Sequence, residues 1–341
     1  MNRTMDRNQF GQLLRSTIVP ENISSEESKQ KLMQIAGALR AMMPEKLYRY
    51  RNCSTLNIDA FDKDLVYAVT ADKFNDPYDT LIQYDIESIR QQVRCYCNKD
   101  FISALQMLFR KGMEFPHNMT RLFGAENLES LKIQILSCGD IDSLAYEQFY
   151  EYMDSICEKS FLKISDIIKK VSPIACFSET VQSVTMWSHY ADNHEGFALE
   201  YDLRFIPTEG SAMGCSIFPV VYDDHRFEAT DFIAWCFAKG YGIDMKQPDQ
   251  FAHFKLSLHK STQWEYEKEW RLFHNIQDGS DESRATSMTI VPKAIYYGKN
   301  ILPINRKLLH FIAREKRIAE YDMYIDSASF KYEMLSKPAV F

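Results

Sequence analysis

The chain of 341 residues is 45% hydrophobic and 26% charged, which is typical of a globular protein with one large domain or two ordinary ones. Its formal net charge of −7 weighs against a protein that binds nucleic acid through its overall field, although a local basic groove remains compatible with it. No run approaches the roughly 18 apolar residues of a membrane span, and the polar segment Met1–Leu14 lacks the apolar stretch of a signal peptide.

The eight cysteines are irregularly spaced and contain no paired CxxC units. This pattern weighs against a structural zinc site and is typical of reduced thiols in the core of a cytoplasmic protein. We therefore expect a cytoplasmic protein without a membrane partner.

The first elements read as two helices and two strands. Apolar residues three and four apart predict a helix over Glu26–Met43, which Pro44 ends. We then expect a strand at Lys46–Arg51, a helix at Ser54–Lys63 and a strand at Asp64–Ala71.

The segment Phe74–Asp79 (FNDPYD) predicts a turn, because Asp76 precedes Pro77 and is driven out of the helical region. Its polar side chains, Asn75 among them, either cap their own turn or contact a ligand, and the sequence supports both interpretations.

Residues 85–171 form the most helical part of the chain and contain no candidate catalytic cluster. We interpret them as a helical insertion. The predicted organisation is an N-terminal helical segment at 1–44 followed by a single α+β domain at 45–341 that contains this insertion.

After the insertion, strands and helices follow one another without regular alternation, which disfavours a doubly wound parallel sheet. The chain has only 12 Gly and neither a GxGxxG nor a Walker loop. The expected strands lie at 173–179, 196–201, 215–222, 265–273 and 287–298, the expected helices at 183–191, 231–240, 251–258 and 304–317, and the expected final extended segment at 321–332.

The first candidate site is Met186–Phe197, which places polar and aromatic side chains together around a predicted helix end. A metal site would use His189, Asp192 and His194, but their spacing does not put both histidines on one helical face. Ser188 and His189 are adjacent and point apart in a helix, so they do not form a dyad. The remaining interpretations are a polar pocket wall made by Ser188, His189 or Tyr190, and a structural helix end that satisfies buried backbone groups.

The second candidate site is Trp264–Arg271. On a strand, residues two apart share a face, so three glutamates would line one side: Glu265, Glu267 and Glu269. Like charges in a row repel, so we expect a cation beside them, either Arg271 on the same face, an arginine of Lys46–Arg51, or a cationic substrate.

A Glu-x-Glu pair suits the cleavage of a glycosidic C–N bond. A carboxylate near the ribose stabilises the oxocarbenium-like transition state, and a second carboxylate orients or deprotonates the acceptor. Charged strands often contain such a pair, so the pair alone is a weak signal.

Five motifs occur in an order that suggests a family. They are Leu47–Arg51 (LYRYR), Phe74–Asp79 (FNDPYD), Cys176–Glu179 (CFSE), Met186–Ala191 (MWSHYA) with Gly196-Phe197, and Tyr266–Arg271 (YEKEWR). Together they resemble the bacterial family of unknown function DUF2971, over roughly Glu45 to the C-terminus with the insertion between.

The layout of these motifs also looks like a divergent ADP-ribosyltransferase, which would place small mixed or antiparallel sheets around a central cleft that binds NAD. The resemblance implies phosphate or ribose contacts by Arg49 or Arg51, and stacking of Trp187 or Tyr190 on nicotinamide. Glu269, or else Glu267, would hold the ribose 2′-hydroxyl. WSHYA replaces the Ser-Thr-Ser triplet of that superfamily. The other candidate cofactor contacts are Asn75, Asp76, Ser188, His189 and Arg271.

We therefore expect an enzyme that cleaves the nicotinamide–ribose bond of NAD, in a bacterial defence or toxin setting and with an acceptor that the sequence does not name. One alternative is a non-catalytic ligand- or nucleic-acid-binding module that uses Lys46–Arg51 and the basic helix Arg306–Arg317. The other is a metal-dependent hydrolase or nuclease with the ligands Asp76, Asp79, His189 and Glu267. A transferase needs arginines and aromatic rings around one glutamate, whereas a metal site needs converging carboxylates and histidines.

Overall fold

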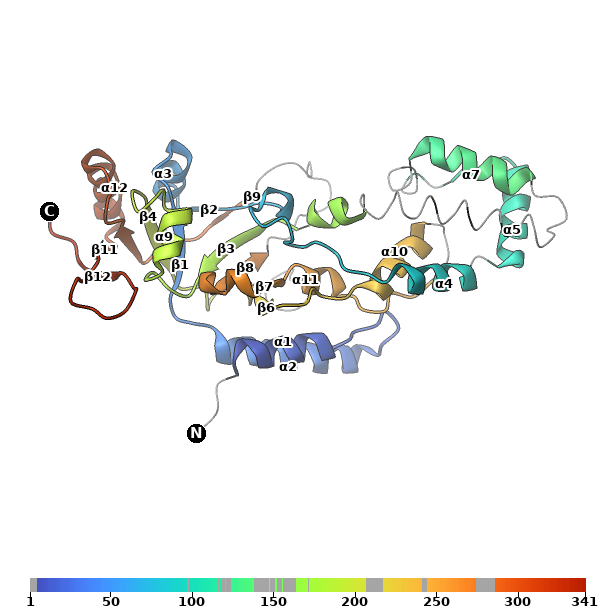
Figure 1. The fold of residues 1–341 in the computed structure, drawn as a ribbon, viewed down its shortest axis with the longest axis horizontal. Helices are drawn as coiled ribbons and strands as arrows, with labels where there is room; N and C mark the ends of the chain where they lie inside the picture. The colour runs from blue at the N-terminus through green and yellow to red at the C-terminus, as the bar shows by residue number, and fades with distance from the viewer. Residues whose placement is uncertain are drawn as a thin grey trace.

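The computed structural model describes residues 5–96, 98–115, 117, 120, 124–137, 147, 151, 155, 164–170, 172–206, 217–240, 244–273 and 286–341. They form an α+β fold in which strands gather toward one end of an elongated molecule and helices α5 and α7 lie at the other (Figure 1). The predicted α+β class is confirmed.

Helices and strands largely follow the sequence pattern. The α-helices are α1 (Arg7–Ser16), α2 (Ser25–Met42), α3 (Thr55–Asp62), α4 (Ile86–Tyr96), α5 (Lys99–Arg110), α7 (Ala125–Ser137), α9 (Val184–Tyr190), α10 (Thr230–Gly240), α11 (Ala252–Leu256) and α12 (Pro303–Lys316). The 3-10 helices are η1 (Ala71–Lys73) and η2 (Thr262–Glu267). The strands are β1 (Leu47–Arg51), β2 (Leu65–Ala68), β3 (Ile174–Ser178), β4 (Phe197–Tyr201), β5 (Ile217–Pro219), β6 (Val221–Asp223), β7 (His259–Ser261), β8 (Glu269–Phe273), β9 (Thr286–Thr289), β10 (Ala294–Tyr297), β11 (Ala319–Tyr324) and β12 (Leu335–Pro338).

The main sheet has eight strands in the order β12-β11-β10-β4-β1-β3-β8-β5. Among the described strands of this sheet, β10 and β11 run parallel and the other neighbours run antiparallel, so the sheet is mixed. Two smaller sheets pair β2 with β9 and β6 with β7. This order puts β1 near the centre, with β4 on one side and β3 on the other.

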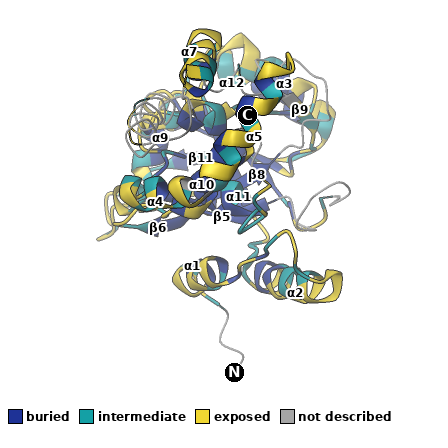
Figure 2. Ribbon diagram, turned by 90° about the vertical axis from the view of Figure 1, so that its right-hand side faces the viewer, coloured by how far each residue is buried: buried dark blue, intermediate teal, exposed yellow. Residues whose placement is uncertain are grey.

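The two faces of the main sheet bury different helices. On one face, Phe10 of α1 and Leu39 of α2 join a large core with residues of β3, β4 and β8. On the other, Trp187 of α9 packs edge-on against Tyr50 of β1, with ring centroids 5.1 Å apart. Helices α1 and α2 each carry a buried stripe and an exposed stripe (Figure 2), as amphipathic helices on a sheet do. The N-terminal helices therefore share the core of the sheet.

A second core lies in the helical part of the molecule. Side chains of α4, α5 and α7 from the predicted insertion pack there against α10 and α11, which come much later in the chain. The part of the predicted insertion after residue 137 falls mostly outside the described residues. Among those described, no helix is long and apolar enough to cross a membrane.

The strand expected over residues 265–273 begins only at Glu269. Residues up to Glu267 form η2, and Lys268 takes a left-handed conformation with φ of 44° between the two elements. The prediction that Glu265, Glu267 and Glu269 share one strand face is therefore wrong, and Glu265 is exposed. The alternation of charged and aromatic residues predicted a strand. The segment instead begins as a 3-10 helix, because the Ser261 side chain caps it by accepting a hydrogen bond from the Gln263 backbone N–H.

Candidate functional site

A pocket of about 460 Å³ opens where β1, β3, β8 and α9 meet the segment after β2. Its volume is in the range of small-molecule sites. We call it the main pocket. The lining residues are Tyr48, Arg49, Tyr50, Arg51, Val69, Lys73, Phe74, Asn75, Ile174, Cys176, Phe177, Ser178, Met186, His189, Tyr190, Lys260, Glu267, Glu269 and Arg271.

The main pocket is rich in positive charge although the whole chain is acidic. Its lining includes five cationic side chains, from Arg49, Arg51, Lys73, Lys260 and Arg271, against two carboxylates. Such a surface favours an anionic ligand, because the walls exclude water and strengthen the attraction.

Arg49 is a cation of this lining whose charge the protein compensates poorly. One of its terminal nitrogens donates a hydrogen bond to the Tyr67 carbonyl, and its guanidinium lies 5.6 Å from the centroid of the Phe177 ring. Its Nε is buried without a hydrogen-bond partner, and no ion pair joins it to a carboxylate of the described residues. Burial lowers the pKa of Arg49. A guanidinium left in this state is well suited to a phosphate or carboxylate of a ligand.

Glu267 lies at the end of η2 and is only 4% exposed. Its Oε1 accepts a 2.6 Å hydrogen bond from the Tyr190 hydroxyl, and its Oε2 lies 2.6 Å from Lys260 Nζ. Burial raises the pKa of Glu267, while Lys260 opposes this rise. Glu267 is therefore a carboxyl group with a perturbed pKa that lines a pocket, as is common for groups that transfer protons or stabilise charge.

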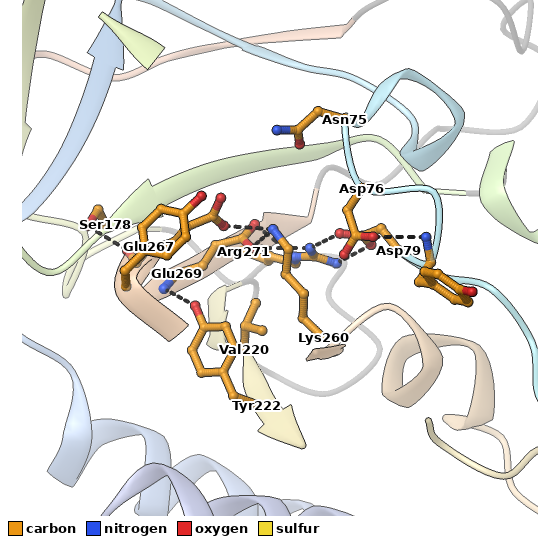
Figure 3. Close-up of polar contacts among 12 residues, drawn as sticks. Asn75, Asp76, Asp79, Ser178, Val220, Tyr222, Lys260, Glu267, Glu269 and Arg271 are labelled. Carbon is orange, nitrogen blue, oxygen red and sulfur yellow. Dashed lines mark hydrogen bonds and ion pairs between the residues drawn. The ribbon is translucent and has the colours of Figure 1, made fainter. Parts of the chain in front are cut away.

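Glu269 lies deeper, in a network of buried ion pairs. Arg271 Nε donates to Glu269 Oε1 at 2.9 Å, and the Arg271 guanidinium also forms a bidentate pair with Asp79 of the FNDPYD turn. Figure 3 shows the Arg271 side chain between the two carboxylates. Burial would raise the pKa of Glu269, but Arg271 and Lys260 overcome this effect and lower it to about 2. Glu269 and Arg271 therefore hold together the wall of the pocket.

Tyr190 and its neighbours connect α9 to the FNDPYD turn. The Asn75 side-chain amide donates to the Tyr190 hydroxyl at 3.0 Å, and the same hydroxyl donates to Glu267. Burial is the main cause of a raised pKa at Tyr190, so the hydroxyl keeps its proton. His189 contacts the Tyr266 hydroxyl through Nδ1 at 3.2 Å.

Three candidates from the sequence do not line the main pocket. Trp187 is fully buried and its Nε1 donates to the Val181 carbonyl, so its ring is not available for stacking on nicotinamide. Ser188 donates to the Val184 carbonyl and lies 3.1 Å from His194 Nε2. Asp76 lines a different pocket. The pocket does bring together Arg49, Arg51, Asn75, His189, Tyr190, Glu267, Glu269 and Arg271.

Comparison with known proteins identifies one segment of the chain. Residues 186–272 match the family described as "Protein of unknown function (DUF2971)". The chain carries a DUF2971 domain. Neither the search of curated proteins nor that of solved structures found a match, and no comparison supports an ADP-ribosyltransferase fold.

The DUF2971 segment supplies only part of the main pocket. It contributes Met186, His189, Tyr190, Lys260, Glu267, Glu269 and Arg271, while β1, the FNDPYD turn and β3 lie outside the matched residues. We call the ion-paired group of Lys260, Glu267, Glu269, Arg271 and Asp79 the charged wall. All of its members except Asp79 belong to the DUF2971 segment, and Arg49 reaches the pocket from the rest of the sheet.

Lys260 is the main feature of the site that sequence reasoning missed. It lies on the three-residue strand β7 and donates to both Glu267 and Glu269, so it supplies the cation expected beside the glutamates. Its pKa is raised: burial lowers it, but the carboxylates of Glu269 and Glu267 outweigh that effect. A single lysine in a short strand carries no sequence signal that distinguishes it from a surface lysine.

The Ser188–His194 contact was also missed, because the helix ends between the two residues and the chain turns back. Asp192, Asn193 and His194 all have positive φ, between 50° and 70°, and this turn brings His194 over Ser188.

The described residues contain no group of three or more His, Cys, Asp and Glu side chains arranged to hold a metal ion. The four proposed ligands of a hydrolase are engaged separately. Asp79 pairs with Arg271, Glu267 with Lys260 and Tyr190, and His189 with Tyr266. Asp76 accepts its own turn's Tyr78 N–H.

Proposed function

We propose that the main pocket binds NAD and that Glu267 assists the cleavage of its nicotinamide–ribose bond. The observation that carries this proposal is the set of arginines and aromatic rings around one perturbed carboxylate in a pocket with excess positive charge. That combination is the one expected of a transferase site, whereas a metal site would need converging carboxylates and histidines.

The negative charges of the dinucleotide would be placed against Arg49, with Arg51 and Lys73 beside it in the same lining. Tyr190 and Phe74 offer ring surface for the nicotinamide or the adenine. Stacking was expected of Trp187 or Tyr190, and in this proposal Tyr190 takes that role because Trp187 is buried.

Glu267 is preferred to Glu269 for the chemistry. Glu269 is bound on both oxygens by Arg271 and Lys260, whereas Glu267 Oε1 is held only by the Tyr190 hydroxyl. A carboxylate there would stabilise the positive charge that develops on the ribose as the C–N bond breaks.

The proposed reaction balances without a redox step. The C1′–N bond breaks with its electron pair moving to the pyridinium ring, so nicotinamide leaves as a neutral molecule. An oxygen of water or of an acceptor then bonds to C1′ and releases its proton. In cytoplasm, where NAD is available, such an activity would deplete NAD and fit a defence or toxin role.

The test is to incubate the purified protein with NAD and follow nicotinamide release for the wild type, Glu267→Gln and Glu265→Gln. Glu265 is the matched control, because it lies in the same 3-10 helix but is exposed. We expect Glu267→Gln to slow release by about 10²–10³-fold, as for loss of one charge-stabilising group, and Glu265→Gln to have no effect.

Binding is measured separately, by calorimetry with NAD on the wild type and on Arg49→Met. We expect Arg49→Met to weaken binding about tenfold or more, since it removes a charge-assisted contact. Binding of NAD without release of nicotinamide would indicate a non-catalytic nucleotide-binding module rather than an enzyme. Neither binding nor release by the folded wild type would refute the proposal.

A further inference from the structure

A second pocket of about 530 Å³ lies beside the main pocket, and Lys260 lines both. Its walls come from the FNDPYD turn, the segment after β6, and the start of η2. We call it the Asp76 pocket. The residues that matter for its chemistry are Asp76, Tyr78, Asp224, His259, Lys260 and Trp264.

Asp76 is a buried carboxylate with one oxygen free. The residue is 4% exposed, and its Oδ1 accepts a 2.9 Å hydrogen bond from the Tyr78 backbone N–H. Its Oδ2 is buried and has no hydrogen-bond partner. Leaving a buried charged oxygen without a donor is costly, so this oxygen calls for a donor from outside the chain.

None of the basic side chains that line this pocket forms an ion pair with Asp76 among the described residues. Lys260 is held by Glu267 and Glu269, and no ion pair joins it to Asp76. Burial lowers the pKa of His259 to about 4, so its ring is neutral near pH 7. Arg226 is exposed and donates to the Ile82 carbonyl. His225 extends into solvent with a side chain that is 93% exposed.

The other two carboxylates of the lining already have donors. Asp223 pairs with Arg15 at 2.5 Å, and Asp224 accepts from the Thr262 hydroxyl. Asp76 is therefore the member of this acidic group with a buried oxygen that no donor reaches, and Figure 3 shows it next to the Asp79–Arg271 pair.

We propose that the Asp76 pocket binds a guanidinium or a primary ammonium group, such as that of an arginine or lysine side chain, through Asp76 Oδ2. Tyr78 and Trp264 line the same pocket, but their rings already pack against Arg226 and Lys260, which lie 6.0 Å and 4.7 Å from the respective ring centroids. The ion pair with Asp76 therefore carries the binding. This site stands apart from NAD binding, so it holds whether or not the main pocket cleaves NAD.

The probes are N-acetyl-arginine amide, N-acetyl-lysine amide and N-acetyl-citrulline amide, titrated by calorimetry into the full chain. Citrulline has the shape of arginine without the charge, so it isolates the ion pair. We expect the wild type to bind the arginine or lysine probe at least about tenfold more tightly than the citrulline probe, and the better of the two identifies the group.

The variants Asp76→Asn and Asp224→Asn locate the effect. Asn keeps an oxygen for the Tyr78 N–H but removes the charge, so we expect Asp76→Asn to bring the charged and neutral probes within about threefold of each other. Asp224→Asn removes a carboxylate from the same lining and should keep the discrimination. Equal changes in both variants would indicate a general field and overturn the assignment.

The proposal remains testable if Asp76→Asn does not fold. Binding next to Trp264 should change its fluorescence in the wild type, and Trp264→Phe should remove that change. No binding of either charged probe by the wild type, or equal binding of arginine and citrulline probes, overturns the proposal.

Discussion

Arg271 provides the most direct test of the charged wall. The residue is 0% exposed and contacts two carboxylates, Asp79 and Glu269, together with the Ser257 carbonyl. Arg271→Met keeps much of the volume and removes the charge. Asp79 then keeps the hydrogen bond from the Thr80 hydroxyl, and Glu269 keeps the one from Lys260. Breaking a buried pair by removing one partner costs about 3–5 kcal/mol, a large part of the roughly 5–15 kcal/mol that stabilises a domain.

The measurement is urea unfolding followed by circular dichroism, with Arg204→Met as the control. Arg204 also pairs with two carboxylates, Asp202 and Glu45, but on the surface, so its loss should leave the free energy of unfolding nearly unchanged. If Arg271→Met is no more costly than Arg204→Met, the cluster does not hold the pocket wall together.

The pKa of Glu269 is lowered from 4.5 to about 2, so its contribution to the free energy of unfolding is complete above pH 4.5 and is lost as the pH falls to 2. The difference in this free energy between the wild type and Glu269→Gln should therefore change by about 3 kcal/mol across this range, as measured by urea unfolding. Tyr190→Phe removes the hydroxyl that contacts Glu267 and should lower nicotinamide release and cost about 1–2 kcal/mol in unfolding, whereas Tyr266→Phe should retain release. A Cβ at Gly298 would lie 2.2 Å from the His194 carbonyl oxygen, so Gly298→Ala should destabilise the protein by roughly 1–3 kcal/mol or more. Gly37→Ala, on the exposed face of α2, should instead stabilise the protein by about 0.5–1 kcal/mol. Thermal unfolding measures both variants.

Local signals predicted the elements that carry most of the site. The helix expected at 183–191 is α9, and the Ser183 hydroxyl caps it by accepting a hydrogen bond from the Met186 N–H. The strand at Lys46–Arg51 was expected and is β1, because basic and aromatic residues alternate along it. These predictions are confirmed because each depends on neighbours within a few residues.

The sequence did not predict contacts that depend on distant segments. Trp187 looks like a pocket aromatic, but β1 and Val181 bury it, and only the packing of α9 on the sheet decides this. Lys260 gains its role because η2 and the start of β8 bring Glu267 and Glu269 within hydrogen-bonding distance of β7. The 3-10 helix η2 was itself not predicted, because the alternation of charged and aromatic residues in its sequence is typical of a strand.

The charged wall poses a question that stability alone does not answer. Lys260, Glu267, Glu269, Arg271 and Asp79 place five ionisable groups in the interior, and each is at most 8% exposed. Replacing such a cluster with apolar residues is often neutral or stabilising, so burial of the charges is not explained by the energy of the pairs.

The arrangement makes sense if the cluster serves the pockets on either side of it. Asp79 and Arg271 fix Glu269 from one end, and Glu269 helps to hold Lys260, which in turn fixes Glu267 at the surface of the main pocket. Each step is a charge-assisted contact, and such contacts restrict the position of the next side chain. The outermost member, Glu267, is the one left with an oxygen held only by a hydroxyl. The cluster thus positions one carboxylate against Arg49 and the aromatic lining, which is where a ligand with both negative charge and hydroxyl groups would meet it.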